Sequence, residues 1–347
     1  MEFKNKIKSK IVKKPVSEKK VSPVTNRTLE TERKEVLKNA QKFKYPVQYS
    51  KHKLVINTLI ISFILGLAGL AFVTLRLYAA QDTGTFIYRI SKFLPFYSVA
   101  QIDGENVRYS DYLMEYRANM TLTDTKKGAL EVDSDFKSRS NRFKKSAMDN
   151  SLKNALALKI ARENNIKVSD QEIAERIAEQ RKSSTREISE KDFYASIAAN
   201  YGLSPQEYRR MFVELPLYRS KVSAFLDKDA EALKNQVTEF LSKNENSFEK
   251  LAANFVNKIE VGKSGNVRHS NIDGGRTRTA LDLKVGETSK PFISKSGDGY
   301  YVVKLISKTD TEVSYEYAKI PFSAFENKFT ALKNDGKIQE FIKIEGR

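Results

Sequence analysis

The chain reads LVINTLIISFILGLAGLAFVTL from Leu54 to Leu75, 22 residues without a charged side chain. A helix of this length spans about 33 Å, enough to cross a hydrocarbon core of about 30 Å. Buried helices of soluble proteins are usually shorter and have a polar face. A cleaved signal peptide has a shorter apolar run and a small residue near the cleavage site, where this chain has Leu77 or Tyr78. The stretch therefore predicts a transmembrane helix, residues 54–76, that stays attached as an anchor.

Positive charge is concentrated on the N-terminal side of this helix. Residues 1–53 contain 16 Lys and Arg and five Glu, so they hold +11 of the formal net charge of +18. The tail is poor in large apolar residues, which predicts a disordered segment, and the positive-inside rule places it in the cytoplasm. Basic tails can bind nucleic acid, but membrane orientation and attraction to anionic lipid already account for this charge. We therefore expect a single-pass protein of the cell membrane with an extracytoplasmic body, in contact with the lipid bilayer and not with nucleic acid.

The residue composition excludes several kinds of chemistry. The 347 residues include no Cys and only two His, His52 and His269. Disulfides and cysteine nucleophiles are thereby excluded, and a His-based metal centre or a Ser-His-Asp triad has almost no residues to draw on. Apolar residues make up 40% of the chain, enough for a folded core. We expect a folded protein with no cofactor and no metal.

The juxtamembrane segment, residues 77–98, contains a short amphipathic pattern. Its apolar positions are Phe86, Ile87, Ile90, Phe93 and Leu94, and a proline follows them. This spacing predicts a helix. Two placements of that helix stay open, on the outer membrane surface or packed against the folded body.

Residues 99–226 have a helical pattern after a short hairpin. Two extended runs flank Asp103-Gly104, a turn signal, and Ser110 is placed to cap the helix that follows. The polar stretch 121–141 predicts a loop, and apolar residues at steps of four predict a helix over 142–163.

Three further helix starts are marked by N-terminal capping patterns. Ser169 and Glu172 form a capping box, Ser204 and Glu207 form another that is followed by a proline, and Ser189 precedes an acidic residue at the third helical position. These patterns predict helix starts but say nothing directly about function.

Residues 227–347 change to a mixed pattern of helices and strands. Helices are predicted through residue 255, and Gly and polar residues dominate from 262 to 278. Asp227 and Asp229 are expected to face solvent near a helix start. The predicted strands are Phe292-Ile293, Gly299 to Ile306 and Val313 to Ile320. Ser323 and Glu326 form a capping box that opens a last helix.

Three segments of the helical half carry a resemblance. They are VAQIDGENVRYSDY (Val99 to Tyr112), NNIKVSDQEI (Asn164 to Ile173) and YGLSPQEYRRMF (Tyr201 to Phe212). In this order and spacing they resemble the N-terminal domain of SurA-type folding factors. The resemblance implies an α-helical SurA-N-like chaperone domain over residues 99–226, whose partners are unfolded or secreted client polypeptides.

Three segments of the second half carry another resemblance. They are FEKLAANF (Phe248 to Phe255), ALDLKVGETSKPF (Ala280 to Phe292) and GDGYYVVKL (Gly297 to Leu305). They resemble a parvulin-type peptidyl-prolyl cis-trans isomerase domain of the PpiC kind. The resemblance implies a small α+β parvulin-like domain over residues 227–347. The expected fold is thus a single transmembrane helix, a helical domain and this α+β domain.

The departures from the parvulin pattern concern its active site. In that family a strand ahead of the first helix carries one active-site His, and the closing strand carries another. Here FLDKDAEALK (Phe225 to Lys234) precedes the helix without a His, Tyr301 stands at the second position, and Arg276 lies near the position of the family's proline-gripping Phe. We assign no catalytic residue. Isomerisation needs no covalent intermediate, so weak activity remains compatible with apolar walls alone.

Tyr301, Phe292 and Leu283 are the candidate substrate-binding residues, although a core or sheet-surface role is the more common one for Tyr301, and a core role for Phe292 and Leu283. The strand expected at Val313 to Ile320 lies after the closing strand, and we hypothesise that it fills the vacant sheet position. This hypothesis requires it to pair with residues 299–306.

The expected function is that of a membrane-anchored extracytoplasmic folding factor that binds unfolded or emerging polypeptides, with weak or absent isomerase activity. The alternative is a non-catalytic scaffold of a cell-envelope assembly. A concave apolar groove between the two halves would favour the first, and a flat patch would favour the second.

Overall fold

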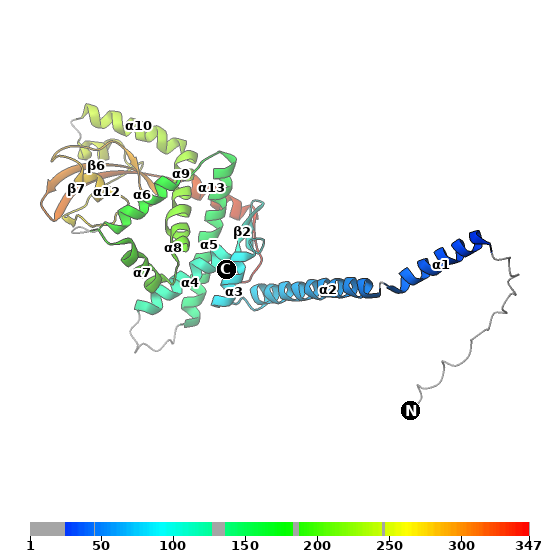
Figure 1. Cartoon of the computed structure of the whole chain (residues 1–347). Coiled ribbons are helices and arrows are strands. Elements are labelled where there is room, and N and C mark those ends of the chain that lie inside the picture. The colour runs from blue at the N-terminus through cyan, green and yellow to red at the C-terminus, as the bar shows by residue number, and fades with distance from the viewer. Residues whose placement is uncertain (1–24, 45, 127–135, 183–186, 245–246, 347) are drawn as a thin grey trace. The chain divides into compact units, whose positions relative to one another are not determined.

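The computed structural model describes residues 25–44, 46–126, 136–182, 187–244 and 247–346. The chain divides into two compact units, Met1–Ala71 and Phe72–Arg347 (Figure 1). The second unit contains both the helical half and the half with the larger sheet.

Helix α1 (Asn26–Lys44) lies in the tail for which the sequence predicted disorder. Its first turn is held by Thr25 and Thr28, because the backbone N–H of each donates to the hydroxyl of the other. Lys, Glu, Leu and Ala, all good helix formers, fill much of its length. Local propensity thus accounts for the difference, and residues 1–24 lie outside the described residues.

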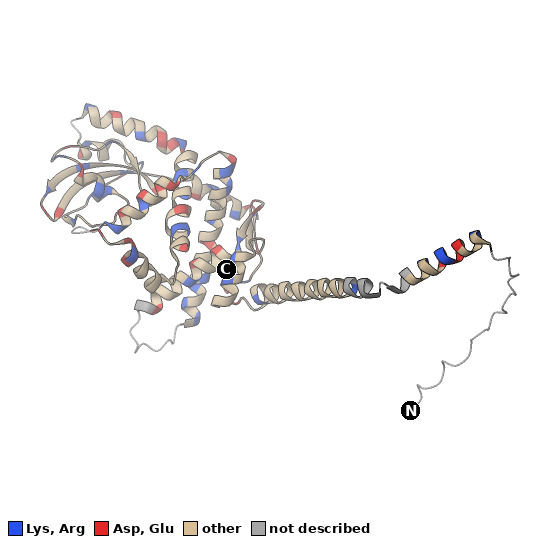
Figure 2. Ribbon diagram, in the orientation of Figure 1, with Lys and Arg blue, Asp and Glu red and all other residues tan. Residues whose placement is uncertain are grey.

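Helix α2 (Pro46–Thr74) continues into a wider π-helical turn, η1 (Leu75–Ala79). Residues Lys53–Ala79 are long and apolar enough to cross a membrane. Most apolar side chains along them are exposed, and α2 is almost free of charge in Figure 2. The predicted apolar helix is therefore present.

The helical half is built mainly from helices that pack around α4 and α5. The elements in chain order are α3 (Thr85–Phe93), β1 (Ser98–Ile102), β2 (Glu105–Arg108), α4 (Tyr109–Lys126), α5 (Phe136–Glu163), α6 (Asp170–Arg181), α7 (Glu190–Tyr201), α8 (Pro205–Tyr208), η2 (Arg209–Glu214) and α9 (Leu215–Leu226). The hairpin of β1 and β2 and the three capped starts of α6, α7 and α8 are as predicted.

Two boundaries in this half differ from the sequence prediction. Helix α4 begins at Tyr109, so Ser110 lies inside it and is not its cap. The loop predicted over 121–141 is shorter, because α4 runs to Lys126 and α5 begins at Phe136. Tertiary contacts extend both helices: the hydroxyls of Tyr116 and Ser140 are 2.8 Å apart, and Arg139 pairs with Asp124 at 3.2 Å.

A continuous helical run, residues 205–226, contains a π-helical segment, η2. Pro216 lies two residues beyond the end of this segment. Its ring nitrogen has no hydrogen to donate to the carbonyl four residues earlier, so the α-helical ladder is interrupted here and the turn widens. The widened turn carries Arg210, which lines a cavity described below.

The sheet half contains a five-stranded antiparallel sheet of order β3-β7-β6-β5, with β4 also paired to β7. Its elements are α10 (Lys228–Lys243), α11 (Phe248–Asn254), β3 (Glu260–Lys263), β4 (Val267–Arg268), α12 (Arg276–Leu281), β5 (Phe292–Ile293), β6 (Gly299–Lys308) and β7 (Glu312–Pro321). Helices α10 and α11 pack on one face of the sheet, and α12 packs on the other. The sequence did not predict the short strands β3 and β4.

Strand β7 pairs antiparallel with β6 along its whole length, from Gly299 opposite Pro321 to Lys308 opposite Val313. It also pairs with β3, so it lies in the middle of the sheet. The hypothesis that residues 313–320 pair with the closing strand is therefore confirmed. The central strand β7 thus follows the closing strand β6 in the sequence.

The C-terminal segment returns to the helical half. Helix α13 (Ala324–Asn334) contributes Phe325 and Phe329 to the core of that half, and β8 (Ile338–Glu340) pairs with β1. The hydrophobic core of the helical half therefore contains residues from both ends of the body.

Asp227 is buried at 4% exposure, which corrects the expectation that it faces solvent. Its Oδ1 accepts from the N–H of Ala230 at 3.0 Å, and its Oδ2 accepts from the N–H groups of Ser323 and Ala324 at 2.6 and 2.9 Å. One carboxylate thus caps the starts of α10 and α13. Ser323 makes no side-chain cap, so its predicted capping box is wrong. The Ser323 N–H, from which Glu326 would accept in that box, donates to Asp227 instead.

Candidate functional site

A row of four side chains crosses the face of the sheet that α12 covers. Phe292 on β5 lies opposite Tyr301 on β6, Tyr301 lies opposite Lys319 on β7, and Lys319 lies opposite Glu260 on β3. Directly paired residues project to the same face of a sheet. Phe292 and Tyr301 stack with ring centroids 6.2 Å apart, and Lys319 reaches Glu260 at 3.4 Å.

Asp298 connects the two central members of this row. Tyr301 donates its hydroxyl hydrogen to Oδ2 of Asp298 at 3.0 Å, and the Lys319 ammonium lies 3.2 Å from the same oxygen. Burial alone would raise the pKa of Asp298, but hydrogen bonds from Ser294 and Ser296 and the charge of Lys319 hold it at about 2. The carboxylate is therefore ionised at neutral pH. Burial and this neighbouring charge raise the pKa of Tyr301, which keeps its phenol protonated.

Arg276, at the start of α12, lies over the rings of the site. Its guanidinium carbon is 5.2 Å from the centroid of Tyr301 and 4.5 Å from that of Tyr317. Such a cation over aromatic faces is an attractive contact. The ring of Tyr317 in turn lies against Gly262 of β3, where a Cβ would come within 2.6 Å of the phenol oxygen. Arg276 therefore covers part of the aromatic surface of the sheet.

The loop that leads to Arg276 is organised by Asp273. Its carboxylate accepts hydrogen bonds from the N–H and hydroxyl of Thr277 and from the hydroxyl of Tyr315. Gly274 and Gly275 follow with φ of 75° and 101°, a conformation that glycine adopts without strain. These contacts fix the loop against β7 and hold Arg276 in place.

The structure brings only some of the three substrate-binding candidates predicted from sequence into direct contact. Phe292 and Tyr301 are in contact. Leu283 and Phe292 both pack against the same apolar cluster. Tyr301 is only 5% exposed. His269 lies elsewhere on the sheet half, with Nε2 3.3 Å from the carbonyl oxygen of Glu312.

Sequence reasoning missed two members of the site, Lys319 and Asp298. Lys319 is the one lysine of strand β7 and Asp298 lies in a turn, and neither position carries a motif that would single it out. Arg276 was noted from the resemblance alone. Among the described residues, no group of three or more His, Asp and Glu side chains is placed to hold a metal ion.

A cavity of about 340 Å³ lies between α6 and the loop that contains Asp273. Arg176 of α6 donates to the carbonyl oxygen of Lys295 at 2.9 Å, and the Lys295 ammonium pairs with Glu179. These contacts join the two halves beside the cavity. Its lining includes Arg278 and Lys182, and most of its lining residues are polar or charged.

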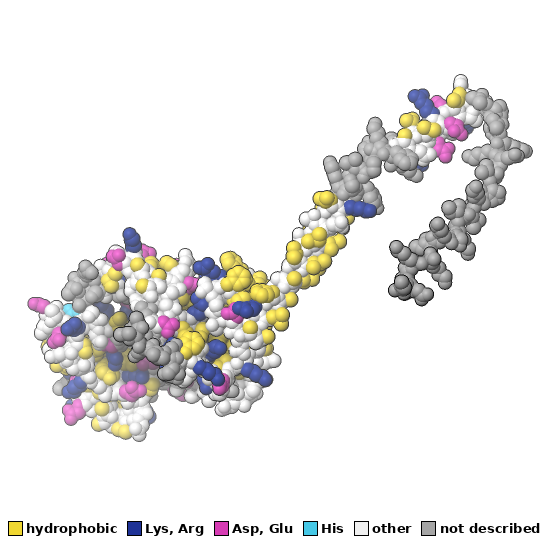
Figure 3. All heavy atoms as spheres, turned by 90° about the horizontal axis from the view of Figure 1, so that it is seen from below, with side chains coloured by type: hydrophobic (Ala, Val, Ile, Leu, Met, Phe, Trp, Pro, Cys, Tyr) yellow, Lys and Arg dark blue, Asp and Glu magenta, His cyan; other side chains and the backbone are white. Residues whose placement is uncertain are grey.

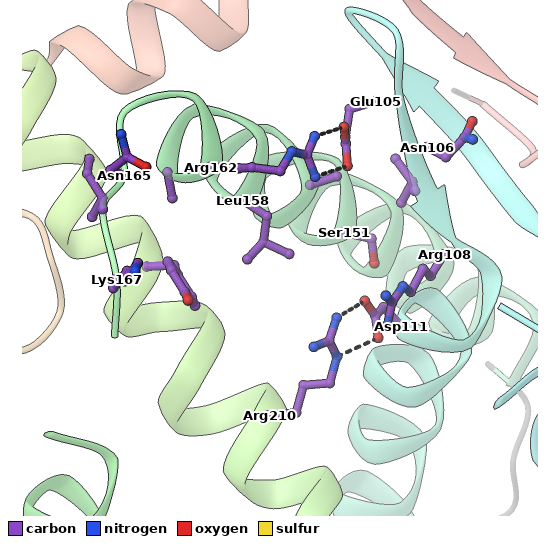
Figure 4. A pocket seen from close by; sticks show the side chains of 15 residues that line it. Glu105, Asn106, Arg108, Asp111, Ser151, Leu158, Arg162, Asn165, Lys167 and Arg210 are labelled. Carbon is purple, nitrogen blue, oxygen red and sulfur yellow. Dashed lines mark hydrogen bonds and ion pairs between the residues drawn. The ribbon is translucent and has the colours of Figure 1, made fainter. Parts of the chain in front are cut away.

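A larger cavity of about 480 Å³ lies within the helical half, between α5, β2 and the run that contains η2 and α9. Figure 4 shows two arginine–carboxylate pairs that border it. Arg210 meets Asp111 with distances of 2.9 and 2.7 Å, and Arg162 meets Glu105 with distances of 3.3 and 2.5 Å. Neither this cavity nor the smaller one is lined by Tyr301, Phe292 or Leu283.

Comparison with known proteins adds two matches. The family described as the SurA-like N-terminal domain matches residues 50–219. The family described as the PPIC-type PPIASE domain matches residues 218–307. Searches of curated proteins and of solved structures gave no match.

Proposed function

We propose, from the premise that this chain is a folding factor with a SurA-like N-terminal domain and a PPIC-type PPIase domain, that it is tethered to a membrane and binds unfolded polypeptides there. We further propose that its prolyl isomerase activity is weak or absent. The observation that carries the folding-factor role is the presence of both domains, in this order, in one chain.

The apolar helix supports the membrane tether. Its residues Lys53–Ala79 meet the length and composition of a membrane span, and their apolar side chains are mostly exposed. In the proposed orientation the Lys- and Arg-rich tail is cytoplasmic and the body is extracytoplasmic.

The C-terminal end of this helix is fixed to the body. Leu77 is fully buried, and its carbonyl oxygen accepts from the hydroxyl of Tyr109 at 2.6 Å. The hydroxyls of Thr74 and Tyr97 are 2.7 Å apart. These contacts hold the last turns of the helix, residues 74–77, within the body unit that begins at Phe72.

Helix α3 provides a second contact with the membrane. Ile87 and Tyr88 are buried against the body, whereas Phe86, Phe93 and Phe96 are 66, 83 and 63% exposed. Figure 3 shows hydrophobic side chains along the helix. Exposed aromatic rings beside a membrane span are suited to the bilayer interface. In this proposal one face of α3 packs against the body and the other lies on the membrane surface, so both placements left open by the sequence apply.

The contacts within the aromatic site on the sheet support our proposal that isomerase activity is weak or absent. Lowering the barrier requires a pocket that binds the twisted X-Pro amide better than the planar one. Here Tyr301 is held by Asp298, and Arg276 lies over its ring. If Tyr301, Phe292 and Leu283 bind a client, they do so as an apolar surface and without an acid or base to transfer protons.

Membrane orientation is directly testable because the chain has no Cys. Single variants Thr31→Cys in α1 and Ser242→Cys in α10 place one thiol on each side of the helix. We expect a membrane-impermeant maleimide to label Ser242→Cys in intact cells and Thr31→Cys only after permeabilisation. The reverse pattern would overturn the orientation.

Client binding separates a folding factor from the scaffold alternative. The full chain in lipid nanodiscs is titrated with a fluorescent polypeptide that is permanently unfolded, and with its native form. We expect binding of the unfolded form alone. No binding of either form would favour the scaffold.

A further inference from the structure

The larger cavity, in the helical half, has an excess of positive charge. Its lining contains four cationic side chains, Arg108, Arg162, Lys167 and Arg210, and two carboxylates, Glu105 and Asp111. Each carboxylate is already engaged by one arginine through both of its oxygens (Figure 4). Among the described residues, the Arg108 and Lys167 side chains have no hydrogen-bond or ion-pair partner, so two positive charges remain for a ligand.

One wall of the cavity carries a buried polar group without a partner. Ser151 of α5 is 2% exposed, and its hydroxyl makes no hydrogen bond within the described part of the chain. A serine inside a helix usually bonds to the carbonyl one turn back or to solvent. An unpaired buried hydroxyl is costly, so its presence at a cavity wall points to a ligand that completes it.

Helix α5 also contributes apolar side chains to this wall. Helix α5 presents Ala155, Leu158 and Ala161 to the cavity, and Val107 and Ile166 border it. Figure 4 shows Leu158 directed into the space between the two arginine–carboxylate pairs. The cavity therefore combines an apolar wall, one polar anchor and a positively charged rim, within the size range of ligand pockets.

We propose that this cavity binds a peptide segment that carries a carboxylate next to an apolar side chain. The carboxylate pairs with Arg108 and Lys167, the apolar side chain packs on α5, and the peptide backbone bonds to the Ser151 hydroxyl. The proposal rests on the proposed function, because it names the feature of the client that this half recognises. The carboxylate has two sources, the C-terminus of a chain or an Asp or Glu side chain.

The test measures fluorescence anisotropy of short Ala/Leu peptides with the full chain in nanodiscs. One peptide ends in a free carboxylate, a second is amidated, and a third is amidated with an internal Glu beside Leu. We expect the free-acid peptide, the Glu peptide or both to bind about tenfold more tightly than the amidated peptide, and added salt to weaken this preference. Which acidic peptide binds more tightly identifies the source.

Two sets of variants connect the preference to the cavity. The double variant Arg108→Gln/Lys167→Gln should abolish it, whereas the control Lys284→Gln/Lys290→Gln, with the same change of charge in the sheet half, should keep it. Ser151→Ala should weaken acidic-peptide binding while raising the thermal midpoint of the free protein, because the unpaired hydroxyl is removed.

Equal binding of all three peptides would overturn the inference, and so would a preference that survives the double substitution. If the unfolded polypeptide of the previous section still binds, the proposed function stands without it. If neither that polypeptide nor any peptide binds, both fail.

Discussion

Lys319 lies directly opposite Tyr301 on neighbouring antiparallel strands, and both side chains contact the carboxylate of Asp298. Each polar group on this part of the sheet thus has a partner within the protein, and Arg276 lies over the ring of Tyr301. These contacts stabilise this part of the sheet.

The first prediction concerns prolyl isomerisation. Uncatalysed X-Pro isomerisation takes tens of seconds at about 25 °C. The full chain in nanodiscs should raise its rate in a test peptide by less than about twofold. A protease-coupled or NMR exchange measurement gives this rate. An acceleration that Tyr301→Ala removes would contradict our reading of the site.

A second prediction concerns Glu207, which joins the capped start of α8 to α3. Its carboxylate accepts from Tyr88 at 2.6 Å and from Lys92 at 2.7 Å. Although burial alone would raise its pKa, these two bonds and those from Ser204 lower it from 4.5 to about 2. Because the folded pKa is depressed, the stabilisation is present above pH 4.5 and is lost as the pH falls from about 4.5 to 2.

Glu207→Gln should therefore lower the free energy of unfolding by about 1–2 kcal/mol at pH 7 and cost little at pH 2. Denaturant unfolding followed by circular dichroism checks this at several pH values. Glu249→Gln, at an exposed position in the first turn of α11, is the control. An equal loss at both pH values would show that the charge of Glu207 is not what stabilises the contact.

The third prediction concerns the cap shared by two helices. Asp227→Asn leaves only one accepting oxygen for the N–H groups of Ala230, Ser323 and Ala324, so we expect a loss of about 1–3 kcal/mol in the free energy of unfolding. Asp229→Asn, two residues away and exposed, should change it little. A similar effect of both substitutions would contradict the shared cap.

The fourth prediction uses the absence of Trp from the chain. A single Trp introduced as Phe93→Trp should be quenched by brominated lipids in nanodiscs, because the proposed placement of α3 puts this ring at the membrane surface. Phe225→Trp, at the end of α9, should not be quenched. Equal quenching at the two positions, or none at Phe93→Trp, would remove α3 from the membrane surface.

Features that depend on neighbouring residues could be predicted from the sequence. The capping boxes of Ser169 and Ser204 formed as expected because each needs only the next few residues. The cap by Asp227 could not be predicted, since Ser323 and Ala324 lie almost a hundred residues further along the chain.

The pairing of Tyr301 with Lys319 shows why the register of two strands is harder to predict from the sequence than the strands themselves. Residues near the turn pair as Lys308 with Val313, but a β-bulge between Leu305 and Ser307 shifts the register by one residue. Counting back from the turn without the bulge would put Lys319 opposite Val302, on the other face of the sheet. The sequence could thus give the strand pairing but not the site.

The central claim is that this chain holds unfolded polypeptides without needing to isomerise prolines. Its most direct test is light scattering from an aggregating client that contains no proline, with full-length chain in nanodiscs or with empty nanodiscs. We predict that the chain suppresses aggregation of this client at near-equal molar ratio. Aggregation at the rate seen with empty nanodiscs would contradict the account.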